Sequence, residues 1–173
     1  MMYENIDFNS IDLTQEPPVS EPERQYYFIA KCRQYVKEQE ELAGHPLTAD
    51  VVTFGCQMNQ HDSERVSGLL DSYGCLMALD PEHADIVVFM TCCVREAADT
   101  RLYGQCNSCK SLPPSPSGKR VVAVGGCIAQ RDGEGLLTNV DNVNIEVCNI
   151  HSNGSASACI NLAKLAALPQ NSV

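Results

Sequence analysis

Three cysteines of this 173-residue chain stand in equivalent places, each one to three residues after a short apolar run, and thiolates are ligands for soft metals. They are Cys56, Cys92 and Cys127, spaced 36 and 35 residues apart. A structural zinc site needs four protein ligands, whereas an iron–sulfur cluster held by three cysteines leaves one iron open to another ligand. Spacing alone also fits three ordinary buried cysteines, because an unbonded cysteine is among the most buried residue types. Both interpretations therefore stay open at this level.

The apolar runs predict the elements that would position these cysteines. Residues 51–54, 85–90 and 120–124 are continuous apolar stretches, as is typical of strands covered on both faces. Each is followed by a stretch with helical spacing, the second of which should run from residue 94 to about 105. Residues 144–147 are a further strand candidate. Alternating strands and helices predict an α/β fold, with a parallel sheet of about four to five strands flanked by helices.

In a parallel α/β sheet, functional groups gather at the carboxyl ends of the strands. Because adjacent strands lie about 4.8 Å apart, cysteines in equivalent strand-end turns are expected to converge. Each would also precede a helix, whose free N–H groups stabilise a thiolate. Gly55, Gly125 and Gly126 stand beside the cysteines and let the backbone turn sharply next to a bulky group.

The remaining chain divides by composition. A proline pair and many acidic residues predict a flexible tail at the N-terminus. A helix should follow, with Ser20 as its N-cap, Glu23 completing a capping box and Gly44 ending it after Leu42. We therefore predict a tail (1–19), a helical extension (20–47), the cysteine-bearing domain (48–150) and a C-terminal helix (151–173).

Charge and hydropathy exclude several classes of protein. The chain has 22 acidic and 12 basic residues and a formal charge of −10, so its field should repel nucleic acid and anionic membranes. Apolar residues make up 44%, enough for a core. The sequence has no apolar run of about 18 residues and no leader-like start, which predicts a cytoplasmic protein with no membrane partner. In a reducing compartment its ten cysteines are core residues or metal ligands.

Three motifs carry a resemblance to a known family. Residues 53–59 (TFGCQMN) with 62–64 (DSE), residues 91–96 (TCCVRE) and residues 126–131 (GCIAQR) resemble the motifs of the MiaB-type tRNA methylthiotransferases, in the same order. The resemblance extends from about residue 20 to about 140. It departs from the family pattern at Met90, where the family usually has asparagine.

The resemblance implies a specific role. These enzymes use S-adenosylmethionine radical chemistry to place a methylthio group on isopentenyl-adenosine beside the anticodon of tRNA. Their N-terminal domain holds an auxiliary [4Fe–4S] cluster, whose ligands by motif would be Cys56, Cys92 and Cys127. A C-x-x-x-C-x-x-C triplet binds the second, radical-generating cluster, and the 173 residues contain none. We therefore expect a truncated or fragmentary form, inactive alone, whose radical and RNA-binding domains are absent or supplied by a separate radical S-adenosylmethionine polypeptide.

Other cysteines allow a competing interpretation. Cys106 and Cys109 form a C-x-x-C which, with Cys148 and His151, offers four ligands for a zinc-stabilised structural or interaction module. The remaining cysteines should be packing or surface thiols: Cys32, Cys75, Cys93 and Cys159. Polar residues beside the strand-end turns could hydrogen-bond near a cluster or cap and pair the helices: Asn59, Arg95, Glu96 and Gln130.

Overall fold

A five-stranded parallel sheet organises the molecule, in the order β2-β1-β3-β4-β5. The computed structural model describes residues 5–54, 57–92, 97–112, 120–132 and 145–148. The strands are β1 (Thr48–Thr53), β2 (Leu76–Met77), β3 (Ile86–Thr91), β4 (Val121–Gly126) and β5 (Ile145–Cys148). The predicted α/β class and parallel sheet are confirmed. The short edge strand β2, with both residues exposed, was not predicted.

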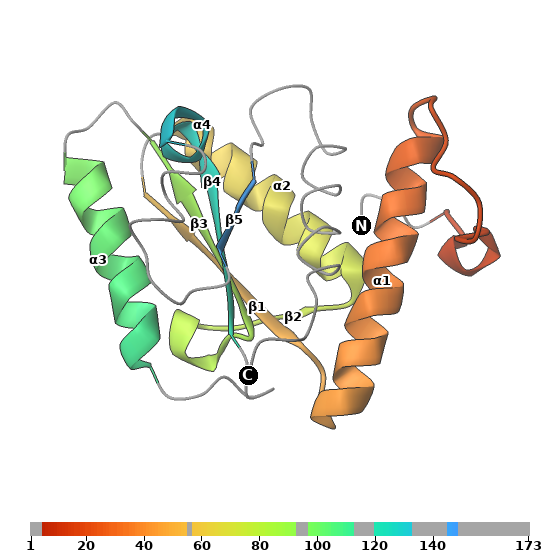
Figure 1. Cartoon of the computed structure of the whole chain (residues 1–173), viewed down its shortest axis with the longest axis horizontal. Helices are drawn as coiled ribbons and strands as arrows, with labels where there is room; N and C mark the ends of the chain where they lie inside the picture. Colours follow the sequence, from red (N-terminus) through yellow and green to blue (C-terminus); the bar gives the residue numbers. More distant parts are fainter. Residues whose placement is uncertain (1–4, 55–56, 93–96, 113–119, 133–144, 149–173) are drawn as a thin grey trace.

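Helices lie on both sides of this sheet (Figure 1). They are α1 (Glu23–Ala43), α2 (Gln57–Tyr73), α3 (Ala97–Ser111) and α4 (Cys127–Asp132). Two 3-10 turns are η1 (Phe8–Ser10) and η2 (Pro81–His83). No helix in the described ranges is long and apolar enough to cross a membrane.

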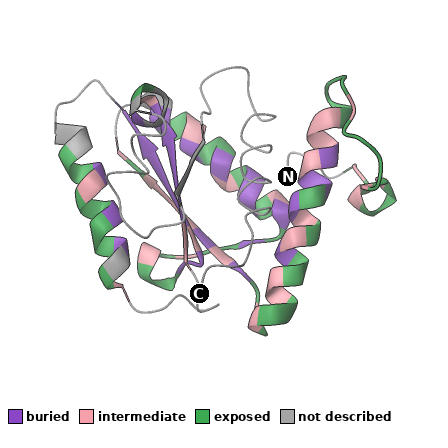
Figure 2. Ribbon diagram, viewed as in Figure 1, coloured by how far each residue is buried: buried purple, intermediate pink, exposed green. Residues whose placement is uncertain are grey.

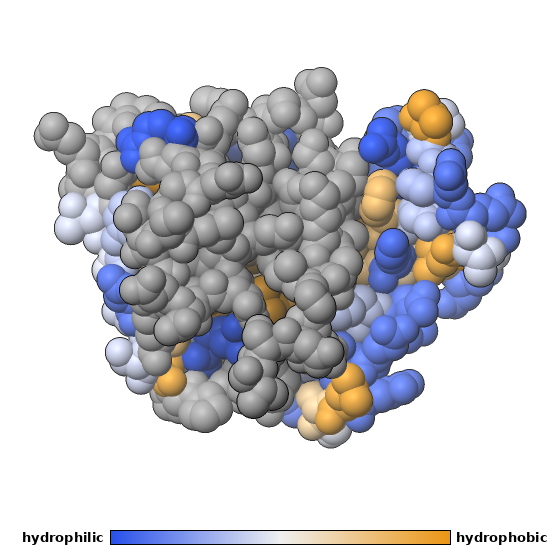
Figure 3. All heavy atoms as spheres, viewed as in Figure 1, coloured by the Kyte–Doolittle hydropathy of each residue, from blue (hydrophilic) through white to orange (hydrophobic). Residues whose placement is uncertain are grey.

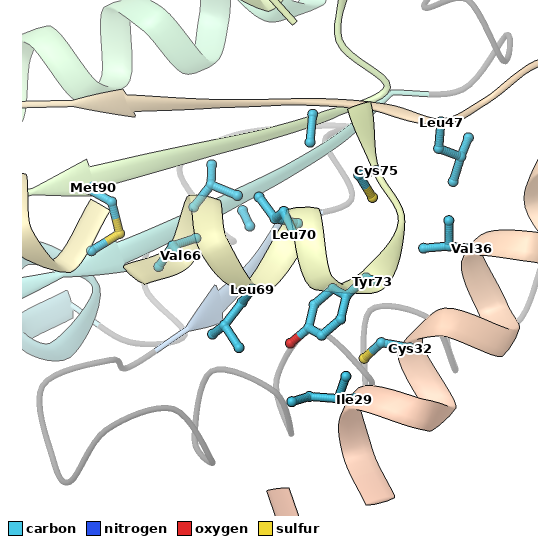
Figure 4. Packing of buried hydrophobic residues seen from close by; sticks show 13 residues of the cluster. Ile29, Cys32, Val36, Leu47, Val66, Leu69, Leu70, Tyr73, Cys75 and Met90 are labelled. Atoms are coloured by element: carbon cyan, nitrogen blue, oxygen red, sulfur yellow. The ribbon is translucent and has the colours of Figure 1, made fainter. Parts of the chain in front are cut away.

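Strand β3 lies at the centre of the sheet and separates two apolar cores. Val88 and Met90 pack with residues of α1 and α2, whereas Val87 and Phe89 pack with residues of α3 and with Ile128 of α4. Successive side chains of a strand point to opposite faces, so the continuous apolar run supplies both cores. Figure 2 shows this buried centre, and Figure 4 shows the core on the α1–α2 side.

Helix α1 begins and ends close to the predicted residues, but its N-cap residue differs from the predicted one. Pro22 is the N-cap and makes no side-chain capping bond, so the prediction of Ser20 as the cap is wrong. The Ser20 hydroxyl instead donates to the Glu23 carboxylate over 3.1 Å. At the C-terminus, Gly44 has φ 74° and donates its N–H to the Glu40 carbonyl. Leu42, an apolar residue in the last turn of the helix, is exposed.

Residues 5–19, predicted to be a tail, make contacts with α1. The Tyr27 hydroxyl lies 3.2 Å from the Leu13 carbonyl oxygen and 3.0 Å from that of Gln15. The Phe8 ring meets the edge of Tyr26, with centroids 6.4 Å apart. The surface over α1 and this segment is mostly hydrophilic (Figure 3).

A polar cluster fixes the register at the amino edge of the sheet. The Thr48 N–H and hydroxyl donate to the buried Asp85 carboxylate over 3.0 and 2.9 Å, and the Asp85 N–H approaches the Thr48 hydroxyl to 3.1 Å. The guanidinium of Arg120 donates to the carbonyls of Ala84 and Glu82. Since β1, β3 and β4 are aligned at their starts, their carboxyl ends are aligned as well.

Candidate functional site

Cys92 and Cys127 lie next to each other in the register of the sheet. The last residues of β3 and β4, Thr91 and Gly126, are Cα partners in the parallel ladder. Cys92 follows the first and Cys127 the second, at the edge towards which both strands run (Figure 1). The Cys92 side chain is buried, whereas Cys127 is partly exposed. The structure therefore brings two of the three predicted ligands to one edge; Cys56 lies outside the described residues.

Gly126 allows an unusually close approach of the two strand ends. Its φ is +87°, in the region that favours glycine. A Cβ atom at this position would lie 2.2 Å from the Thr91 carbonyl oxygen and 2.9 Å from the Thr91 nitrogen. The sequence indicated a sharp turn here. The structure adds that the backbone of one cysteine-bearing strand end lies directly against the other.

The Thr91 hydroxyl joins the same two strand ends from the side chain. It donates to the Gly125 carbonyl over 2.7 Å, and the Ile128 N–H donates to it over 3.3 Å. The residue is completely buried. In the sequence, Thr91 is marked only by its position immediately before Cys92.

The end of β1 is tied both to β3 and to the start of α2. The Phe54 N–H donates to the Met90 carbonyl over 2.7 Å. The Thr53 hydroxyl donates to that of Ser63 over 2.7 Å, and Ser63 donates to the Asn59 carbonyl over 2.7 Å. These bonds fix the chain on both sides of residues 55–56.

Asn59 has a different role from the predicted helix cap. It lies inside the first turn of α2, which begins at Gln57. Its side-chain amide is buried and approaches the Phe54 carbonyl at 3.4 Å. Asn59 therefore helps to hold the chain across the segment that contains Cys56.

The surroundings of this edge are apolar on both faces of the sheet. The Phe54 and Phe89 rings pack with centroids 5.7 Å apart, and Met90 is buried in the α1–α2 core. Met90, noted as a departure from the family pattern, is therefore a packing residue. Apolar neighbours limit the access of water to a metal site, and this exclusion changes the redox potential of the metal. No group of three or more potential metal ligands occurs among the described residues, which do not include Cys56. Two soft sulfur donors on neighbouring strand ends fit an iron–sulfur cluster.

The structure describes the side chains of two of the four competing zinc ligands. Cys106 and Cys109 are buried on α3 among Val87, Phe89 and Leu102. Burial raises the pKa of the Cys109 thiol, and the nearby Arg120 charge opposes that shift. Arg120 precedes β4, at the amino edge, whereas Cys148 pairs with Gly125 near the carboxyl edge. His151 lies outside the described residues, so the zinc alternative stays a prediction.

The two remaining described cysteines belong to the core on the α1–α2 face, as expected of packing thiols. Cys32 and Cys75 are both buried there (Figure 4). Desolvation, followed by the negative charges of Glu40, Asp85 and Asp71, raises the pKa of Cys75 to about 12. This thiol therefore stays protonated at neutral pH.

Several predicted residues cannot be placed at the site. Those outside the described residues are Cys93, Arg95, Glu96 and Cys159, and the side chain of Gln130 is likewise not described. Helix α3, predicted from residue 94 to about 105, is described from Ala97 and continues to Ser111.

The fold and the strand-end cysteines define an α/β domain with a thiol-rich edge, and comparison with known proteins gives its family. Residues 48–168 match the family described as uncharacterized protein family UPF0004. The chain belongs to this family.

Three of the curated relatives that the chain resembles share one name. The chain is 46% identical over 122 residues to the tRNA-2-methylthio-N(6)-dimethylallyladenosine synthase of Paenarthrobacter aurescens, covering 70% of this chain and 23% of that protein. It is 48% identical over 118 residues to the synthase of the same name from Mycobacteroides abscessus, covering 68% and 23%. It is 43% identical over 120 residues to the synthase of the same name from a Nocardioides species, covering 69% of this chain and 24% of that protein. The chain thus spans about a quarter of the length of these relatives.

Proposed function

We propose that this chain holds an auxiliary [4Fe–4S] cluster through Cys56, Cys92 and Cys127, as part of a tRNA-2-methylthio-N(6)-dimethylallyladenosine synthase. The observation that carries the proposal is the register of β3 and β4, because Cys92 and Cys127 directly follow a paired Thr91 and Gly126. The position of Cys56, two residues after a Phe54 that is bonded to Met90, supports its inclusion. The similarity to synthases of this name supports the same role.

The residues of this chain would ligate the cluster, hold its cysteine ligands in position and shield it from water. The three thiols bind as thiolates, which requires each to lose its proton. Thr91 and Gly126 keep two of the ligand-bearing turns in contact, and Phe54 with Phe89 limits the approach of water from the α3 side. When bound, the cluster supplies an iron atom without a cysteine ligand, at which the sulfur to be inserted can bind.

We propose that the sites for tRNA and S-adenosylmethionine lie outside residues 1–173, in the same or in a separate polypeptide. The cysteine triplet of the radical-generating cluster does not occur in this sequence. The formal charge of −10 also disfavours strong independent binding of RNA by these residues, since phosphates would be repelled.

The test is anaerobic reconstitution of the full chain with iron and sulfide, followed by visible absorbance. We expect a brown protein with a broad absorbance shoulder, lost in Cys56→Ala, Cys92→Ala and Cys127→Ala. Cys75→Ala and Cys106→Ala are the matched controls, since both remove a buried thiol that is not among the three proposed ligands. Retention of the absorbance in all three ligand variants, or zinc without iron after anaerobic purification, would contradict the proposal.

A further inference from the structure

We propose that Thr91 is the positioning residue that holds Cys92 and Cys127 at the spacing needed by a shared cluster. This inference rests on the proposed function, and it assigns to one buried hydroxyl the retention of the cluster. Thr91 would not touch the iron or the sulfide; it would act through the backbone of the two ligands.

The hydroxyl of Thr91 contacts the chain on both sides of Cys127. Its acceptor, the Gly125 carbonyl, is two residues before that cysteine, and its donor, the Ile128 N–H, is one residue after it. Thr91 itself is joined by a peptide bond to Cys92. One side chain therefore connects the residue before one ligand to both flanks of the other.

This connection adds something that the sheet does not provide. The β3–β4 ladder runs from the Ile86–Val121 pair to the Thr91–Gly126 pair and stops there. Ile128 lies beyond the ladder, in the first turn of α4. The hydroxyl bond to its N–H is thus a link between β3 and the chain after Cys127, at the place where β4 gives way to the helix.

The burial of this hydroxyl also indicates a specific use. Thr91 has no exposed surface, and a buried hydroxyl is costly unless its hydrogen bonds are made. A valine has nearly the same shape and would serve the apolar core without that requirement. The hydroxyl is explained if its hydrogen bonds to the residues on either side of Cys127 are needed to position that ligand.

The test compares Thr91→Val, which removes the hydroxyl, with Thr91→Ser, which keeps it. The control is Thr48→Val: the Thr48 hydroxyl also links β1 to the residues before β3, but at the amino edge. Each full-length variant is reconstituted anaerobically, and two quantities are measured: the rate of iron transfer to a chelator, and the electron paramagnetic resonance spectrum of the reduced cluster.

We expect Thr91→Val to lose iron about 10-fold faster or more, the usual scale for groups that orient metal ligands, with a changed spectrum. Thr91→Ser should match the parent, and Thr48→Val should do so at temperatures well below its unfolding transition. Equal iron loss in Thr91→Val and the parent, or equal acceleration in Thr48→Val, would overturn the inference. If Thr91→Val does not fold, Thr91→Ala against Thr91→Ser provides the same comparison of the hydroxyl, and equal rates again overturn it.

A failure of the inference is distinguishable from a failure of the proposed function. If Cys92→Ala and Cys127→Ala abolish the cluster while Thr91→Val retains it normally, the ligands stand and only the role of Thr91 falls. If the cysteine variants retain the cluster, the proposed function itself falls.

Discussion

Replacement of Gly126 by alanine should be one of the most damaging single-methyl changes in this protein. The backbone φ of +87° costs an L-residue about 1–2 kcal/mol. The added Cβ would also lie 2.2 Å from the Thr91 carbonyl oxygen, which is backbone and cannot rotate away. Forced repacking of this kind costs about 1–3 kcal/mol. The two contributions together predict a loss of about 2–5 kcal/mol, a large part of the 5–15 kcal/mol typical of a domain.

The assay is urea unfolding of the metal-free protein, followed by circular dichroism. Gly44→Ala is the matched control, because Gly44 also has a positive φ, 74°, but nothing lies within 4 Å of its added Cβ. Gly44→Ala should therefore show only the conformational cost, about 1–2 kcal/mol. If Gly126→Ala is no more destabilising than Gly44→Ala, the close contact between the two strand ends is not real.

Two further predictions concern the α1–α2 side of the molecule. Because the pKa of Cys75 is raised from 9.0 to about 12, its contribution to stability is complete below pH 9 and is lost between about pH 9 and 12. Cys75→Ala should therefore remove part of the alkaline fall in the free energy of unfolding, up to about 1.4 kcal/mol per pH unit; an unchanged slope in urea titrations would contradict this. Tyr27→Phe removes a hydroxyl donor shared between the Leu13 and Gln15 carbonyls and should cost about 0.5–1.5 kcal/mol. It should also speed amide exchange in residues 12–16, and unchanged exchange there would show that this bond does not hold the segment.

The sheet was predictable because its strands are local signals. Each central strand is a continuous apolar run, and β3 supplies Val87 and Phe89 to one core and Val88 and Met90 to the other. Strand β2 has only two residues, both exposed, although it lies in a short apolar run at residues 75–79. It is defined by its pairing with Thr48 and Ala49 of β1.

Helix α3 continues beyond its predicted end at about residue 105. The Cys106–Cys109 pair suggested ligands, yet Leu102, Cys106 and Cys109 follow one face of the helix and are buried. Read as small apolar residues, these cysteines extend the helical stripe to Ser111.

The details of the candidate site depend on contacts between residues distant in sequence. Thr91 bonds to groups 34 and 37 residues away, and Gly126 matters because of the register with β3. The motif spacing predicted that cysteines meet at one edge. It gave no indication of the hydroxyl that joins their strands, since that bond exists only once the sheet has formed.

The most direct test of the central claim is the iron and acid-labile sulfide content per chain after anaerobic reconstitution and desalting. We expect about four of each, as for any [4Fe–4S] cluster, and near-complete loss of both in Cys92→Ala and in Cys127→Ala while both variants remain folded. Stoichiometric iron and sulfide in either folded variant would show that the adjoining ends of β3 and β4 do not hold the cluster.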